Sequence, residues 1–246
     1  MFSQGRLRIL RKAYRIVSNN NNSILKLILP KPERKFLSFV IRNRDISNSQ
    51  IFQDLLPLYI FQNNLETKSY FVEVGANDGI TFSNTLLLEE KYGWDGLLIE
   101  PNQKLAEVIN IRKCKWAPFA VGEKNNEIKK FFASTNSLLS STSHKSRSFV
   151  TEYEVISHTL TKILKINNVP QNIDFMTIDI EGDELEAIRN LDLNYYQIKI
   201  ICVEHNYDRI KEALIDDHMK SYGYVRILRV ASQFDAFYVK NEYIKN

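Results

Sequence analysis

Cysteine is nearly absent from this sequence of 246 residues, which contains only Cys114 and Cys202. Two thiols are too few for a disulfide framework or a cysteine-ligated metal cluster, so a small disulfide-stabilised secreted domain is excluded. Cys202 lies inside the apolar run 198–203, which predicts a buried and reduced thiol. We therefore expect the protein in a reducing compartment, the cytoplasm.

Long apolar runs are absent as well. No stretch approaches the ~18 apolar residues that indicate a membrane-spanning helix. Near the N-terminus, Arg6, Arg8 and Arg11 interrupt the apolar positions, so we expect no secretory signal peptide. The composition, 44% hydrophobic and 25% charged, is instead typical of a folded domain with a substantial core.

Positive charge is concentrated at the start of the chain. Residues 1–50 contain 11 Lys or Arg and 2 Asp or Glu, whereas the remaining residues contain 22 and 27. Leu7, Leu10 and Tyr14 follow helical spacing, with basic residues mostly between them. Two interpretations stay open: a solvated pair of basic helices, or an arm over residues 1–45 that contacts a membrane surface or another polyanion.

The hydrophobic periodicity divides the chain into two regions. We predict a basic helical extension over residues 1–65, with helix over 33–64, and an α/β domain over residues 66–246. In the second region strands alternate with helices, which indicates a largely parallel, doubly wound sheet. The predicted strands are 70–74, 96–99, 116–121, 175–180, 198–203, 224–230 and 235–239, with an additional strand at 129–133 and a polar loop at 134–148. The predicted helices in this region are 81–92, 103–111, 160–166, 184–190 and 209–222.

Ligands of such sheets bind beyond the carboxyl ends of the strands, so the residues just after each strand are the candidates for function. The first strand is followed by Gly75-Ala76-Asn77-Asp78-Gly79, and Glu73 lies within it. Glycines allow a sharp turn and a close approach to a ligand. The loop lacks the G-x-G-x-x-G pattern of dinucleotide folds, and its carboxylates would repel a pyrophosphate. They suit a cationic nucleoside, so the electrostatics favour S-adenosylmethionine (SAM) over NAD.

The second predicted strand ends at Glu100-Pro101, and Glu100 follows Gly79 by 21 residues. An acidic side chain at this position accepts hydrogen bonds from both ribose hydroxyls of a bound nucleoside. The two acidic strand ends at this spacing therefore predict one SAM-binding crevice.

A second acidic group follows the fourth and fifth strands. Asp179 comes directly after one apolar run, and Glu204 and His205 come after the next. Neighbouring strands would bring the three side chains together beside the methyl acceptor. Two carboxylates and an imidazole make a hard divalent site for Mg²⁺ or Mn²⁺; alternatively His205 or Asp179 acts as a general base.

Three segments together resemble the FkbM family of SAM-dependent methyltransferases: Phe71 to Gly79, Leu98 to Pro101, and Ile173 to Glu184 with its Asp179-Ile180-Glu181-Gly182 block. The resemblance covers about residues 70–240. It implies a Rossmann-like sheet of seven strands whose last strand is antiparallel, and O-methylation of hydroxyls on sugars or natural products. It also implies that Glu73, Gly75, Asn77 and Glu100 hold SAM. The Ser-rich stretch around Ser137, Ser140 and Ser141 is similar to a family segment near the cofactor, and we expect Asp78, Gly79, Pro101 and Ala120 to border the cofactor too.

We accordingly predict an O-methyltransferase that acts on a sugar, a glycan or a glycosylated natural product. Methylation of nucleobase amino groups is disfavoured, because the Asn/Asp-Pro-Pro-aromatic segment of such enzymes is replaced by Asp179 to Gly182. Two alternatives remain: an RNA ribose 2′-O-methyltransferase, which only the basic arm supports, and an inactive SAM-binding scaffold that the arm tethers to a membrane or partner.

Overall fold

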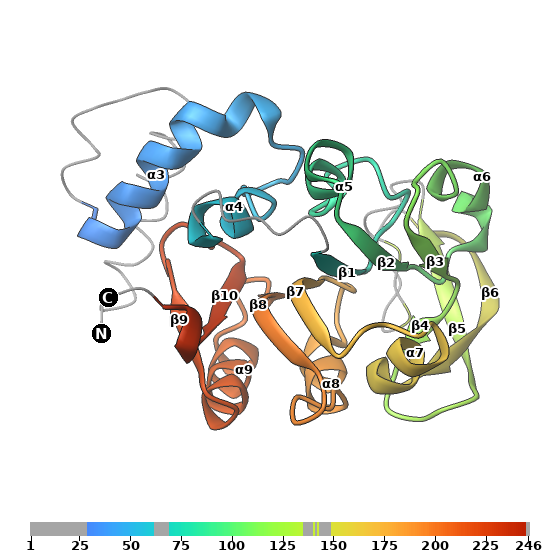
Figure 1. Cartoon of the computed structure of the whole chain (residues 1–246). Coiled ribbons are helices and arrows are strands. Elements are labelled where there is room, and N and C mark those ends of the chain that lie inside the picture. Colours follow the sequence, from blue (N-terminus) through green and yellow to red (C-terminus); the bar gives the residue numbers. More distant parts are fainter. Residues whose placement is uncertain (1–28, 62–68, 135–139, 141, 143–148, 245–246) are drawn as a thin grey trace.

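The computed structural model describes residues 29–61, 69–134, 140, 142 and 149–244. The predicted helix near the N-terminus, the predicted boundary between residues 65 and 66, Ser137 and Ser141 lie outside the described residues. Figure 1 shows helices on both sides of one large sheet, with a smaller sheet beside its edge.

The large sheet has seven strands in the order β3-β2-β1-β7-β8-β10-β9. All neighbours are parallel except β10, which runs antiparallel to both β8 and β9. This arrangement confirms the predicted seven-stranded, mostly parallel sheet with an antiparallel last strand. The strands are β1 (Tyr70–Val74), β2 (Asp95–Ile99), β3 (Lys115–Ala117), β7 (Asn172–Ile178), β8 (Gln197–Glu204), β9 (Tyr224–Ile227) and β10 (Asp235–Lys240).

Two hydrophobic clusters lie on opposite faces of this sheet, since successive strand residues point to opposite sides. On one face, Val72, Met176 and Ile201 pack against α7 (Leu160–Ile166), α8 (Glu184–Arg189) and α9 (Arg209–Ser221). On the other, Phe71 and Phe175 pack against α5 (Leu86–Tyr92) and α6 (Ala106–Ile109) together with the N-terminal helices. Cys202 is buried in this second cluster, as predicted. No helix in the described part of the chain is long and apolar enough to cross a membrane.

The N-terminal region contributes α3 (Lys31–Asn43) and α4 (Leu55–Phe61) to the second cluster. Buried Glu33 on α3 accepts hydrogen bonds from the backbone N–H groups of Val230 and Ala231, at 3.0 and 3.1 Å. The predicted helix over 33–64 is interrupted between the two helices by a 3₁₀ turn, η1 (Arg44–Ile46), and a loop. In that loop Asp54 accepts hydrogen bonds from the Ser47 and Ser49 hydroxyls, and such side-chain contacts compete with helix formation.

A second sheet of three strands, in the order β4-β6-β5, lies beside β3 (Figure 1). It consists of β4 (Ala120–Val121), β5 (Glu127–Ser134) and β6 (Phe149–His158). The single strand predicted over 116–121 is two strands in different sheets, because Pro118 lacks the N–H that a continuous ladder requires. The sequence-based prediction also missed β6, although exposed Glu152 and Glu154 alternate there with inward-facing residues.

Candidate functional site

The loop after β1 brings the backbone close to the neighbouring strand end. Gly75 has φ +84°, and its N–H donates to the carbonyl of Ile99 at 2.9 Å. A Cβ at Gly75 would lie 1.7 Å from the Asp179 carbonyl oxygen, so only glycine fits. Asn77, also at positive φ, has a buried side-chain Oδ1 without a hydrogen-bond partner among the described residues. That oxygen is a ready acceptor for a ligand group at the tip of β1.

Asp78 and Gly79, further along the loop, shape it from outside the pocket. The Asp78 carboxylate accepts hydrogen bonds from the backbone N–H groups of Ile80 and Thr81 and from the Thr81 hydroxyl. Gly79 has φ +73°, and a Cβ there would lie 3.1 Å from the Leu98 side chain and 3.2 Å from that of Ile109. Both residues therefore hold the turn that presents Gly75 and Asn77.

Glu100 lies at the end of β2 with 7% of its surface exposed. One carboxylate oxygen accepts from the Asn77 N–H and the other from the Asn102 N–H, both at 2.9 Å. Burial raises the pKa of Glu100 to about 7, although the two backbone hydrogen bonds lower it in part. The two donors fix the carboxylate, and each oxygen keeps a lone pair for a hydroxyl group of a ligand.

Glu73 on β1 binds the turn that precedes α5. Its carboxylate accepts hydrogen bonds from the Ser83 hydroxyl at 2.8 Å, the Asn84 N–H at 2.7 Å and the Thr85 hydroxyl at 2.5 Å. Burial raises its pKa, with the nearby Arg112 guanidinium opposing the shift. These contacts hold residues 83–85 in a turn, and α5 therefore begins at Leu86 rather than at the predicted residue 81.

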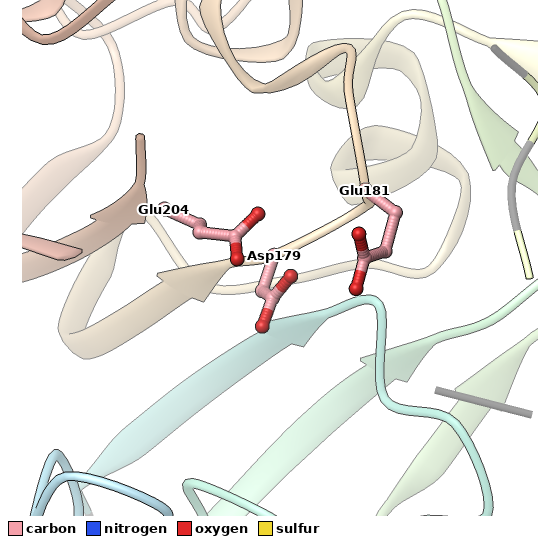
Figure 2. A group of neighbouring side chains, drawn as sticks. All are labelled: Asp179, Glu181 and Glu204. Carbon is pink, nitrogen blue, oxygen red and sulfur yellow. The ribbon is translucent and has the colours of Figure 1, made fainter. Parts of the chain in front are cut away.

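The ends of β7 and β8 carry an acidic group composed of Asp179, Glu181 and Glu204. One carboxylate oxygen of each residue lies within 4.8 Å of those of the other two, and Figure 2 shows the side chains converging. Burial, followed by repulsion from Glu204, raises the pKa of Asp179 well above its usual range. Burial and repulsion from Glu184 raise the pKa of Glu204 to about 8. Such a cluster favours a cation, because a positive charge would let the carboxylates ionise.

Asp235, the first residue of β10, lies opposite Glu204 in the antiparallel ladder. It accepts a hydrogen bond from the Gln53 amide at 3.1 Å, and burial raises its pKa to about 7. The N-terminal region thus reaches the acidic edge of the sheet through Gln53, a contact between residues 182 positions apart that no local pattern reveals.

His205 is fully buried, and the structure does not bring it into the acidic group. Its Nδ1 accepts from the Tyr207 N–H at 3.1 Å, and its Nε2 lies 2.9 Å from the carbonyl oxygen of Asp235. Both ring nitrogens therefore contact backbone groups. The imidazole anchors the turn after β8. Glu181, not His205, is the third member of the acidic group.

Two adjoining pockets open at this edge of the sheet. The larger encloses about 600 Å³, part of it open to solvent, which is a typical size for a small-molecule site. Of the predicted site residues it is lined by Gly75, Asn77, Glu100, Pro101, Ala120 and Asp179. Glu73 lines the smaller pocket, which shares Gly75, Asn77 and Asp179 with the larger. Asp78, Gly79, Glu204 and His205 line neither of these two pockets.

Sequence reasoning missed several lining residues of the larger pocket. Phe119, Val121 and Phe131 supply apolar walls, and Thr142 supplies a hydroxyl. Ser140, which the family resemblance places near the cofactor, also lines this pocket. Phe131 comes from β5 in the small sheet, so its place in the pocket depends on tertiary packing. Glu181 carried a local signal, the Asp-x-Glu-Gly block, but its inward position depends on a positive φ of +57°.

Comparison with known protein families identifies the family of this chain. Residues 73–226, well over half of the chain, match the family model described as "Methyltransferase FkbM domain". The matched family consists of methyltransferases. The chain is a member of this FkbM methyltransferase family. Among curated protein sequences none matches this chain.

Solved structures with a similar fold share little sequence with the chain. An FkbM methyltransferase from Methylobacillus flagellatus is 13% identical, with a TM-score of 0.48 over 93% of this chain and 58% of its own. A putative RNA methyltransferase from Pyrococcus horikoshii is 11% identical, with a TM-score of 0.41 over 76% of this chain and 81% of its own. A plantazolicin methyltransferase solved with S-adenosylhomocysteine (SAH) is 11% identical, with a TM-score of 0.40 over 97% of this chain and all of its own. These values are too low to assign a substrate.

Proposed function

We propose that the protein is a SAM-dependent O-methyltransferase that acts on a hydroxyl group of a sugar, a glycan or a glycosylated natural product. One observation carries the proposal: Gly75, Asn77, Glu100 and Asp179 line a single pocket at the carboxyl edge of the sheet. Membership of a methyltransferase family supports the same activity.

The residues of the larger pocket fit SAM by their chemistry. The fixed Glu100 carboxylate suits the two ribose hydroxyls, and the pocket walls at Phe119 and Phe131 suit an adenine ring. The buried Asn77 Oδ1, which has no hydrogen-bond partner among the described residues, suits the ammonium group of SAM. Bound SAM supplies an activated methyl group, so the protein's task is to align the acceptor and remove its proton.

The acidic group at the ends of β7 and β8 supports the proposed activation of the acceptor hydroxyl. A sugar hydroxyl becomes a good nucleophile when a base removes its proton or a cation acidifies it. Asp179 lies where the two pockets meet, and Glu204 is beside it.

We expect the substitution Glu100→Gln to weaken SAH binding by about 10- to 100-fold, because hydrogen bonds to a charged group contribute roughly 1.5–3 kcal/mol. In the variant, the side-chain NH₂ group of the glutamine would also face one of the two backbone N–H groups, and two donors cannot form a hydrogen bond with each other. Isothermal titration calorimetry with SAH measures the change, and Glu107→Gln, an exposed carboxylate on α6, is the matched control. Equal affinities in all three proteins would reject the ribose role of Glu100.

The pKa of Glu100 also predicts a pH dependence. Between its ordinary value of 4.5 and about 7 the folded protein holds a proton that the unfolded chain has lost. Ionising Glu100 therefore lowers the free energy of unfolding as pH rises through this window, whereas it strengthens ribose binding. We expect SAH affinity to rise between pH 6 and pH 8 in the wild type and to rise less in Glu100→Gln; parallel profiles would assign the dependence to other groups.

Methyl transfer itself is tested with labelled SAM and a panel of sugars, glycans, RNA and small alcohols. Incorporation of label into a carbohydrate hydroxyl is the expected result. Incorporation into RNA would favour the ribose alternative, and SAH binding without transfer to any acceptor would favour the scaffold.

A further inference from the structure

The acidic group at the ends of β7 and β8 is held in place by its own loop. Asp179 follows β7, Glu204 ends β8, and Glu181 is turned toward them by its positive φ. Glu184 fixes this turn, because its carboxylate accepts the N–H groups of Ile180 and Gly182 at 3.1 and 2.9 Å. Lys211 lies near the group but forms an ion pair with Glu184. The three convergent carboxylates are therefore preorganised (Figure 2).

Glu204 provides an independent observation that points to a bound ligand. The residue is 6% exposed, and its Oε2 is buried without a hydrogen-bond partner among the described residues. Leaving such an oxygen unpaired destabilises the folded protein, since the group has lost its hydrogen bonds to water. Figure 2 shows the Glu204 carboxyl group directed toward Asp179, another acid. Asp235, opposite Glu204 in the ladder, also has a buried Oδ1 that no donor in the described part of the chain contacts.

The spacing of the three carboxylates fits one divalent ion. Two oxygen ligands of one ion lie at most twice the metal–oxygen distance apart, which is about 4.2 Å for Mg²⁺ and about 4.6–5.2 Å for Ca²⁺, so Mg²⁺ would draw the carboxylates slightly closer together. The three carboxylate oxygens lie within 4.8 Å of one another. A set composed of oxygen donors favours Mg²⁺ or Mn²⁺ over softer metals.

We propose that Asp179, Glu181 and Glu204 bind a divalent cation, Mg²⁺ or Mn²⁺, which in turn coordinates the acceptor hydroxyl. The role in catalysis rests on the proposed methyl transfer, but cation binding does not. In that reaction the S–CH₃ bond of SAM breaks as the O–CH₃ bond forms, SAH and an ether result, and the hydroxyl proton passes to water. The cation increases the acidity of the hydroxyl and positions its oxygen.

The test is a titration of the whole 246-residue chain with Mn²⁺ in the absence of SAM. Binding is measured as the loss of the free-ion signal in electron paramagnetic resonance. We expect one bound Mn²⁺ per chain. Even the loss of an outer-shell partner typically weakens a metal site by about 10- to 100-fold, so Glu181→Gln should weaken binding at least as much. Glu181 suits the test because its side chain lies on a loop rather than in the core. Glu154→Gln, an exposed carboxylate on β6, should bind Mn²⁺ like the wild type.

Two results would overturn the site: no stoichiometric Mn²⁺ binding by the wild type, or equal binding by Glu181→Gln. Thermal unfolding confirms that each variant is folded. Calorimetry with SAH on the same samples separates the two proposals. Mn²⁺ binding without SAH binding would reject the cofactor assignment and keep the cation site, whereas SAH binding without Mn²⁺ binding would reject the cation site alone.

Discussion

The substitution Gly75→Ala is expected to destabilise the protein by more than about 4 kcal/mol, a cost that few single substitutions reach. The φ of +84° alone disfavours alanine by roughly 1–2 kcal/mol. The larger part comes from the new Cβ, which would lie 1.7 Å from the Asp179 carbonyl oxygen. To relieve this clash, the backbone of β1 or of the loop after β7 must shift, and residues of both segments line the larger pocket. Urea denaturation measures the loss of stability, and calorimetry measures the accompanying loss of SAH binding.

Gly93 offers a matched control for this prediction. It has φ +68°, yet a Cβ there would meet nothing within 4 Å. Gly93→Ala should therefore cost only the conformational preference, about 1–2 kcal/mol, with SAH binding unchanged. If both variants lost the same stability, the close approach between Gly75 and Asp179 would not be the cause.

Asp179→Asn is expected to reduce methyl transfer by about 10²- to 10⁴-fold, because the acceptor hydroxyl loses a carboxylate that acidifies it, directly or through the proposed cation. The amide has nearly the same shape, and the Asp179 backbone N–H still donates to Val74. SAH affinity should consequently fall much less than turnover. Single-turnover kinetics with labelled SAM measures the chemical step, and calorimetry measures binding.

The same variant should be at least as stable as the wild type. Burial and repulsion raise the pKa of Asp179, so the folded protein keeps a proton that the unfolded chain has lost. The free energy of unfolding of the wild type therefore decreases as pH rises above the ordinary value of 3.8, and asparagine removes this dependence. An inactive but destabilised Asp179→Asn variant would point to a structural role instead.

Much of the main domain could be predicted because its signals are local. Apolar runs such as 175–178 and 198–203 indicate strands buried on both faces, and both strands are present in β7 and β8. Helix α7 matches its predicted bounds because Thr159 caps it, accepting a hydrogen bond from the Lys162 N–H. The start of α5 was predicted too early, because the contacts that hold residues 83–85 come from Glu73 on another strand.

The candidate site could be predicted in part for the same reason. Positions directly after parallel strands meet at one edge of the sheet. This rule alone predicts that Gly75, Glu100 and Asp179 lie together, and the three residues line one pocket. The rule fixes a Cα position but not the direction of a side chain. His205 follows β8 as predicted, yet its ring is buried against the backbone of Asp235 and Tyr207.

The sequence alone determined the parallel sheet, its acidic strand ends and the family, because hydrophobic periodicity and strand-end residues are properties of short segments. Only the tertiary structure decided which carboxylates converge. Glu181 joins the acidic group through a left-handed backbone turn, Gln53 reaches Asp235 across the fold, and Phe131 enters the pocket from a second sheet. These contacts join residues distant in sequence, and they depend on the direction of each side chain after the strands have packed.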